Sequence, residues 1–413
     1  MMRKYTRVSF TSKIAFFVVV MFVLCVFAAC GGPKEVPAAN DNAGATGISE
    51  PDSGMPAPAA PGTAEPDSGA SGIQWNHIAP DQASQSIQTN SIPIEIPQFY
   101  DIISYAGNGN GDAFYALGKQ VSMGFIAETT SIFRCDMKGG TVETLKAYDT
   151  HNWISDLGAC DNAVFWVFTD PMAQRIERYD LDTHTLSIVK AIDTSGSADE
   201  IISLTVSDDY IAWFEREIDG RDTYALYAMN ISDGEIQTVT EDASSSQLHN
   251  TRACICDDRI AYVSGPSDSK IVTYDLNAKA VVSTVTDDSG NAAANPQANK
   301  DYLLWEELPP DSNQDKTYML QDFSQDKTYD LNLNSISAQG LFWDFDSTTL
   351  VGDSLYLIEN GTKLALDKAN LSNNTVMTLD ADMKYPSWIG KISETSLLSI
   401  ATDNDESLTT TVY

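Results

Sequence analysis

The sequence predicts an all-β protein, a β-propeller of seven four-stranded blades closed by an N-terminal strand, with six or eight blades as alternatives. Two repeated patterns carry this prediction. Between residues 94 and 413, an Asp-like turn residue followed by a short apolar and aromatic run recurs seven times. A strand, a turn and a second strand follow the first six copies after about 15–25 residues. No stretch of this region keeps a helical period, so very little helix is expected.

The copies of the first pattern are evenly spaced. Successive copies lie 42 to 52 residues apart, which is the length of one four-stranded propeller blade. Each opens a strand rich in large apolar residues, as in Asp209-Tyr-Ile-Ala-Trp213. The copies begin at Asp112, Asn162, Asp209, Asp258, Asp301, Asp353 and, in the weakest form, Thr395.

The second pattern predicts a hairpin within each unit. Arg178-Tyr-Asp-Leu-Asp182 leads into Thr-Leu-Ser-Ile-Val, and Thr273-Tyr-Asp-Leu-Asn277 leads into Ala-Val-Val-Ser-Thr. Runs of Val, Ile, Thr and aromatic residues interrupted by Asp, Asn or Gly turns are typical of hairpins. The pattern is looser in the fifth unit, residues 319–329, and the sixth, residues 367–379. Together the two patterns give about four antiparallel strands per unit.

The seventh unit is one strand short, because the chain ends after three candidate strands. Residues 91–97, Ser-Ile-Pro-Ile-Glu-Ile-Pro, can supply the missing strand. Pro93 and Pro97 share one parity, so both missing N–H donors lie on the same side of that strand, as an outermost edge strand tolerates. We therefore expect residues 91–97 to pair with residues 407–413 and close the ring.

The N-terminus is typical of an export signal. Residues 1–13 are basic and polar, and residues 14–29 carry no charge. Sixteen helical residues span about 24 Å, short of the roughly 30 Å bilayer core. The pair Ala28-Ala29 before Cys30 resembles the lipobox of bacterial lipoproteins, although Phe27 stands where Leu or Val is usual. The resemblance implies cleavage after residue 29 and lipidation of Cys30; an uncleaved membrane helix and plain secretion are the alternatives.

Residues 30–89 form the next predicted segment, a disordered tether rich in Ala, Pro, Gly, Ser and Asp. The domain prediction is thus a signal peptide over 1–29, a tether over 30–89 and a propeller over 90–413. The formal net charge of −33 disfavours nucleic-acid binding and attraction to anionic lipids. Attachment to the membrane is therefore expected through the lipid anchor alone, with the propeller facing outside the cytoplasm.

Two blade segments resemble known propeller families. The segment Tyr210–Met229 resembles the blade repeat of TolB-like propellers, and Val164–Leu181 is similar to the YWTD blades of lipoprotein-receptor propellers. The resemblance covers residues 94–413 and implies the propeller fold. Both families mainly bind proteins, but propellers also carry lyases, hydrolases and dehydrogenases, so the resemblance implies no catalytic residue.

The residues that usually carry catalysis show no suggestive pattern. There is no G-x-S-x-G motif, and no two of the four histidines stand at metal-ligand spacing. Acidic runs such as Asp380-Ala-Asp382 are interpreted as solvated turns, with a calcium site as the alternative. Four cysteines follow Cys30 and are interpreted as small buried residues, with disulfides as the alternative. No catalytic residue, metal or cofactor is therefore predicted.

Aromatic residues that precede several units are the candidate binding site. In a four-stranded blade, the segment just before each copy of the first pattern forms the innermost strand. Tyr100, Trp153, Trp343 and Trp388 are therefore expected at the starts of the innermost strands, around one mouth of the central channel. Aromatic side chains there can anchor a partner protein or stack on sugar rings, or they can simply pack between blades. We expect a binding or scaffold lipoprotein that recognises a protein or an envelope polymer. An enzyme acting on extracellular polysaccharide and an envelope sensor module are the alternatives.

Overall fold

The computed structural model describes strands and short turns of one compact unit, residues 65–413. No helix occurs among the described residues. None of them therefore forms a helix able to span a membrane. The predicted signal peptide and Cys30 lie outside the described residues, which are 73–77, 90–95, 100–108, 110–121, 127–149, 152–194, 200–216, 223–244, 253–264, 270–285, 291–309, 317–331, 348–360, 364–383, 388–393, 396–404 and 407–413.

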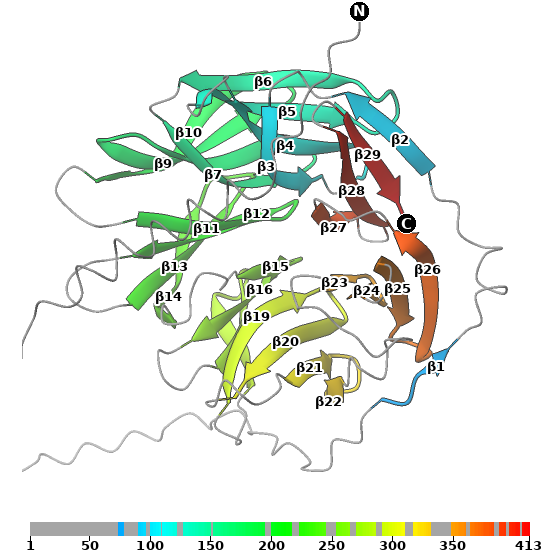
Figure 1. The fold of residues 1–413 in the computed structure, drawn as a ribbon. Helices are drawn as coiled ribbons and strands as arrows, with labels where there is room; N and C mark the ends of the chain where they lie inside the picture. Colours follow the sequence, from blue (N-terminus) through cyan, green and yellow to red (C-terminus); the bar gives the residue numbers. More distant parts are fainter. Residues whose placement is uncertain are drawn as a thin grey trace, which may run out of the picture. The chain divides into compact units, whose positions relative to one another are not determined.

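The strands form seven antiparallel blades (Figure 1). Blade 1 contains β3 (Tyr100–Gly107), β4 (Ala113–Val121), β5 (Ala127–Asp136) and β6 (Val142–Asp149). Blade 2 contains β7 (Trp153–Ala159), β8 (Ala163–Thr169), β9 (Ala173–Asp180) and β10 (Thr185–Asp193). Blade 3 contains β11 (Glu200–Val206), β12 (Tyr210–Arg216), β13 (Thr223–Asn230) and β14 (Ile236–Ser244). Blade 4 contains β15 (Cys254–Cys256), β16 (Arg259–Ser264), β17 (Lys270–Asp275) and β18 (Ala280–Val285).

The remaining blades follow the same plan. Blade 5 contains β19 (Ala292–Ala298), β20 (Tyr302–Leu308), β21 (Thr317–Asp322) and β22 (Lys327–Leu331). Blade 6 contains β23 (Thr348–Val351), β24 (Ser354–Asn360), β25 (Leu364–Asn370) and β26 (Thr375–Met383). Blade 7 contains β27 (Trp388–Ser393), β28 (Ser396–Asn404), β29 (Ser407–Val412) and β2 (Asn90–Glu95). The prediction of seven four-stranded blades is confirmed.

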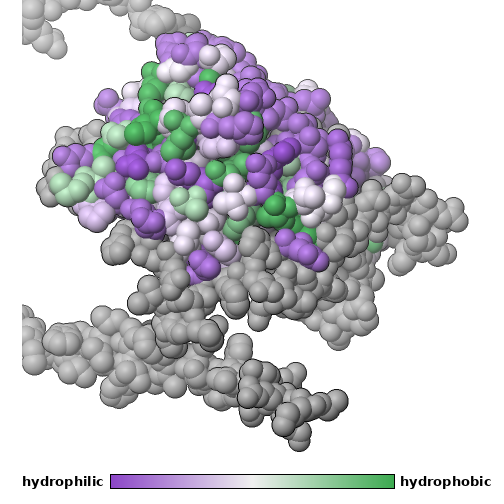
Figure 2. Space-filling view, turned by 90° about the horizontal axis from the view of Figure 1, so that it is seen from above, coloured by the Kyte–Doolittle hydropathy of each residue, from purple (hydrophilic) through white to green (hydrophobic). Residues whose placement is uncertain are grey.

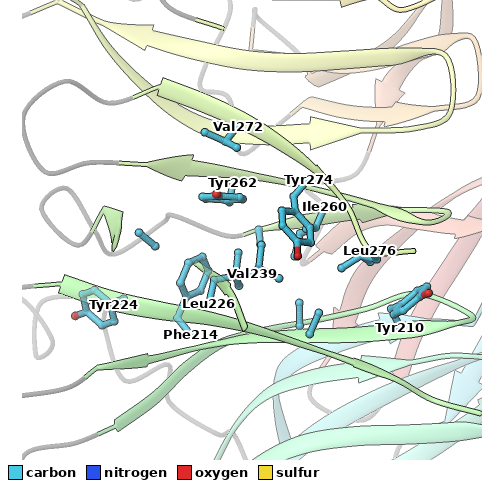
Figure 3. Packing of buried hydrophobic residues seen from close by; sticks show 14 residues of the cluster. Tyr210, Phe214, Tyr224, Leu226, Val239, Ile260, Tyr262, Val272, Tyr274 and Leu276 are labelled. Carbon is cyan, nitrogen blue, oxygen red and sulfur yellow. The ribbon is translucent and has the colours of Figure 1, made fainter. Parts of the chain in front are cut away.

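The blades form a closed ring. The innermost strands touch in the order β3, β7, β11, β15, β19, β23 and β27, and β27 touches β3 again. Seven buried apolar clusters lie between consecutive blades, one at each junction. Figure 3 shows the cluster between blades 3 and 4, where Phe214 and Leu226 lie on one sheet and Tyr262 and Tyr274 on the other. The hydrophobic core is therefore divided among the blade junctions.

The ring is closed by the predicted pairing of the two ends. β2 runs antiparallel to β29, with Asn90 opposite Val412 and Ile94 opposite Leu408. β2 is the outermost strand of blade 7, and β27 is the innermost. The described part of the predicted strand ends at Glu95, so Pro97 lies outside the described residues.

The seven-fold motif has a hydrogen-bond explanation. In each of the first six blades the carbonyl of the motif's first residue, such as Asp209, accepts the amide N–H of the second residue of an Asx turn, such as Ile231 after Asn230. The N···O distances are 2.7–2.9 Å. The bond ties the start of the second strand to the turn between the third and fourth strands. The six first residues are Asp112, Asn162, Asp209, Asp258, Asp301 and Asp353, while Thr395 lies outside the described residues.

Each of those turns is also closed by a side chain. The carboxylate of Asp180, for example, accepts the backbone N–H of Thr183 at 2.9 Å. His184 then takes a positive φ of 54°, a conformation that Gly140 and Gly234 take in other blades. A short polar side chain before a residue in the left-handed region is what such a turn requires. His184 is therefore a turn residue.

A short segment inside the predicted tether joins the fold. β1 (Asn76–His77) pairs in parallel with β26, with Asn76 opposite Thr375. The amide N–H of Asn76 donates to the carbonyl of Asn374 at 2.8 Å. Ile73 and Trp75 pack on the cluster between blades 5 and 6. Residues 73–77 thus add a fifth strand to blade 6, which the tether prediction over residues 30–89 did not include.

Candidate functional site

The two ends of the propeller differ in what they present. We call the end at which the innermost strands begin the start face, and the end that carries the Asx turns the turn face. Tyr100, Trp153 and Trp388 are the first residues of β3, β7 and β27. These strands belong to the consecutive blades 7, 1 and 2, and β3 contacts both β7 and β27. The backbone therefore brings three of the four predicted residues to one sector of the start face; Trp343 and the Trp388 side chain lie outside the described part of the protein.

Trp153 is the exposed member of this group. Its side chain is 58% exposed, although it stands at the junction of two blades. The ammonium of Lys119, at the end of β4 in blade 1, lies 3.4 Å from the centre of its ring. Burial lowers the pKa of Lys119 below its ordinary value, because removal from water disfavours the charged form. A cation held over an indole ring is an attractive pair, so Lys119 and Trp153 orient each other.

Tyr100 is held more firmly. Its ring meets Phe133 edge-on, with ring centroids 5.0 Å apart and planes at 89°. Its hydroxyl lies 3.1 Å from the Oγ of Ser131. A Cβ added at Gly118 would lie 3.2 Å from the Tyr100 ring, so the glycine leaves the space that the ring occupies. Tyr100 is half-buried and forms a fixed edge of the sector rather than a free contact.

This sector also contains two exposed apolar residues that no pattern in the sequence marks. Ile103, 47% exposed, stands at a β-bulge where β3 changes register against β4. Met172, 64% exposed, lies in the turn between β8 and β9, at the same end of blade 2 as Trp153. The Oδ1 of Asp170 accepts the amide of Met172 at 2.8 Å and fixes this turn. In the sequence, neither residue differs from ordinary strand or turn residues. The bulge exposes Ile103, and the turn exposes Met172.

A basic side chain stiffens the same end of blade 2. The guanidinium of Arg175 lies 3.1 Å from Asp170 and 2.7 Å from Glu177, and 3.9 Å from the centre of the Phe168 ring. These contacts lock the Asp170 turn against β9. The candidate site therefore combines Ile103, Trp153 and Met172 with a fixed basic border of Lys119 and Arg175, and we call these five residues the sector patch.

Metal-ligating groups and thiols are the other reactive features to place among the described residues. Among the described residues, no three His, Cys, Asp or Glu side chains are arranged to hold a metal ion. The four cysteines after Cys30 carry free thiols, with Cys135 and Cys160 buried. The interpretation of Asp380–Asp382 as a turn is wrong, because these residues lie within β26, where Asp380 is opposite Leu366 of β25.

Comparisons with known proteins return fold likenesses only. No family model matches the chain, and no curated protein matches it. TolB from Acinetobacter baumannii is 14% identical, with a TM-score of 0.40, and the match covers 62% of this chain and 60% of TolB. A puromycin-hydrolysing peptidase of Mycobacterium tuberculosis is 13% identical, with a TM-score of 0.48 over 74% of this chain and 52% of the peptidase.

An oligogalacturonate lyase in complex with manganese is 11% identical, with a TM-score of 0.46 over 78% of this chain and 97% of the lyase. The chain thus spans little more than half the length of TolB and of the peptidase. Likenesses at these scores carry no argument about activity. The seven-bladed ring rests on the strand order and blade contacts of this chain, in agreement with the propeller fold that the blade motifs predicted.

Proposed function

We propose that this protein is a lipid-anchored extracytoplasmic binding protein whose start face recognises a partner protein. One observation supports the binding role: three exposed apolar side chains lie on the adjacent blades 1 and 2, with Trp153 and Met172 at the start face and Ile103 at the bulge of the innermost strand β3. Exposed tryptophan and methionine at a rigid site are typical of interface hot spots. The export signal that the sequence predicts before Cys30 supports the anchor and the location outside the cytoplasm.

The sector patch favours a protein over a glycan. Sugar rings stack on free aromatic faces that are surrounded by hydrogen-bonding groups. One face of Trp153 already lies under the Lys119 ammonium, and Ile103 and Met172 offer no hydrogen bonds to hydroxyl groups. A partner that inserts an apolar side chain and sets a carboxylate against Lys119 would meet both features of the patch.

Site-specific crosslinking tests the binding role. A photo-crosslinking residue at position 172 should capture a partner on intact cells, and the same residue at position 188 is the matched control. Ile188 is equally apolar and exposed, but it lies on the outermost strand of blade 2. Trp153→Ala should reduce capture from position 172 about tenfold or more, the usual cost of losing a hot spot, with an unchanged melting temperature.

The outcomes separate the candidate functions. Equal capture from positions 172 and 188, or capture that Trp153→Ala leaves unchanged, contradicts binding at the sector patch. Retention of envelope polysaccharide by the purified protein, lost in Trp153→Ala, would replace the protein partner with a glycan. Release of sugars from such polymers would support the alternative of a polysaccharide-degrading enzyme.

The lipid anchor needs its own test. Cys30 should incorporate a radiolabelled fatty acid in growing cells, and the labelled protein should fractionate with membranes. Cys30→Ala should lose the label. The anchor proposal fails if the wild-type protein carries no label, or if Cys30→Ala carries as much label as the wild type.

A further inference from the structure

We propose that a pocket between blades 4 and 5, on the turn face, binds a small zwitterion, namely an α-amino acid with a short aliphatic side chain. The pocket lies at the end of the propeller opposite the sector patch. It therefore does not depend on the proposed binding of a partner protein.

The pocket is formed where two blades meet. Its volume is about 150 Å³. A cavity of about this size holds a ligand of roughly six non-hydrogen atoms, as benzene in an engineered apolar cavity shows. Blade 4 and blade 5 both contribute to its lining, which comprises Cys256, Asp257, Asp258, Arg259, Ala261, Thr273, Ala298, Asn299, Lys300 and Phe323.

The inner wall suits a short alkyl group. Ala261 and Thr273 are buried, and Ala298 and Phe323 are half-buried. The two alanines and the aromatic ring offer apolar surface, while the buried Thr273 hydroxyl, which has no hydrogen-bond partner among the described residues, is a polar group on the same wall. Burial of a methyl group on such a wall is favourable, because it removes apolar surface from water.

The rim carries charges of both signs. Arg259 and Lys300 are exposed, and no ion pair to either is found among the described residues. The Arg259 guanidinium lies 5.8 Å from the Phe323 ring centre, at the edge of the apolar wall. These two cations can receive a carboxylate. Asp257 and Asp258 stand beside them and can receive an ammonium.

The mixture of charges decides the ligand class. A simple anion would face two carboxylates at the rim and a chain with a net charge of −33. A simple cation would face Arg259 and Lys300. A ligand that carries a carboxylate and an ammonium on one carbon satisfies both pairs and leaves its side chain against Ala261 and Ala298.

The wall of the pocket is held in place before any ligand arrives. The side chain of Asn299 donates to the carbonyl of Gly352 at 2.6 Å and accepts the amide of Tyr302 at 2.9 Å. The amide of Ala298 lies 3.1 Å from the sulfur of Cys254. Blades 4, 5 and 6 are thus tied together around the pocket. A preformed wall lowers the entropic cost of binding a small ligand.

Calorimetric titration of the purified full-length protein with alanine tests the proposal, with acetate and ethylamine as the two half-ligands. Alanine should bind, and each half-ligand should bind at least about tenfold more weakly, because each loses one charged contact. Arg259→Gln and Asp257→Asn should each weaken alanine binding by about tenfold for the same reason. Asn also tolerates the positive φ of 50° at position 257, so the turn should survive.

Lys327→Gln is the matched control, because Lys327 is exposed in blade 5 but does not line the pocket. Its alanine affinity and the melting temperatures of all three variants should equal those of the wild type. The proposal is overturned if the wild type does not bind alanine, or if acetate binds as tightly as alanine. It is also overturned if Arg259→Gln binds alanine as well as Lys327→Gln does.

Discussion

Truncation of Ile94 tests the closure of the ring. Ile94 lies in β2, is 0% exposed, and packs with Leu398 and Phe114 in the cluster between blades 7 and 1. Ile94→Ala removes three carbon atoms, each contributing about 0.8 kcal/mol, or about 2.4 kcal/mol of transfer free energy. The cavity left in a cluster of fixed side chains raises the loss of unfolding free energy to about 3–4 kcal/mol.

Urea unfolding followed by tryptophan fluorescence measures this loss. Ile188→Ala is the matched control, because it makes the same chemical change on β10, where the Ile188 side chain is 59% exposed. It should cost less than about 0.5 kcal/mol. If Ile94→Ala costs no more than Ile188→Ala, residues 90–95 do not close the ring and the reasoning is refuted.

Three further substitutions follow from contacts within and between blades. Glu215→Gln should lower the unfolding free energy by about 1–2 kcal/mol, because the buried Glu215 accepts a tryptophan N–H at 2.7 Å and a lysine ammonium at 2.9 Å. The control Glu235→Gln changes an exposed carboxylate and should lower it by less than about 0.5 kcal/mol, as urea unfolding of both variants can check. Gly158→Ala should lower the unfolding free energy by about 1–3 kcal/mol, because its Cβ would lie 2.4 Å from a valine methyl of blade 3, and a loss as small as that of Gly139→Ala would contradict the packing. Burial raises the pKa of the Cys135 thiol from 9.0 to about 12, so its contribution to unfolding free energy is present below pH 9 and falls as the pH rises toward 12; a pH series that is identical in Cys135→Ala would contradict it.

The fold was predictable because its signals are local and repeated. The carbonyl of Asp209 and the turn after Asn230 lie about twenty residues apart, and the same short-range bond recurs in five other blades. A chain that repeats such a unit can bury its apolar faces only by stacking neighbouring units. The closing strand was predictable for a different reason, since two prolines of one parity restricted it to an outer edge.

The candidate site was only partly predictable, because its contacts cross blade junctions. The starts of the innermost strands follow from the repeat, and Tyr100 and Trp153 are placed there. The contact between Lys119 and Trp153 joins two blades, and no spacing in the sequence marks it. The exposure of Ile103 depends on a bulge that changes the register of β3. Register shifts of one residue reverse which face a side chain occupies, and the apolar pattern alone does not locate them.

Apolar exposure alone does not identify a binding site in this protein. The outermost strands β10, β14 and β18 also carry exposed Leu, Ile and Val side chains, and Figure 2 shows hydrophobic residues scattered through a largely hydrophilic surface. Single exposed apolar residues are normal on globular proteins. What distinguishes the sector patch is that Trp153 and Met172 share the start face of blade 2 with a lysine ammonium held over the Trp153 ring.

Basic residues provide the sharper criterion, because they are scarce on this acidic chain. Arg175, Lys190 and Arg216 each pair with a carboxylate in or between blades 2 and 3, and such pairs have a structural role. Within the described residues, neither Lys119 nor Arg259 forms an ion pair; each lies instead over an aromatic ring at a blade junction. A cation that forms no ion pair, on a chain with a net charge of −33, keeps its charge available for a ligand. The sector patch and the turn-face pocket, at opposite ends of the ring, both combine such a cation with an accessible apolar surface.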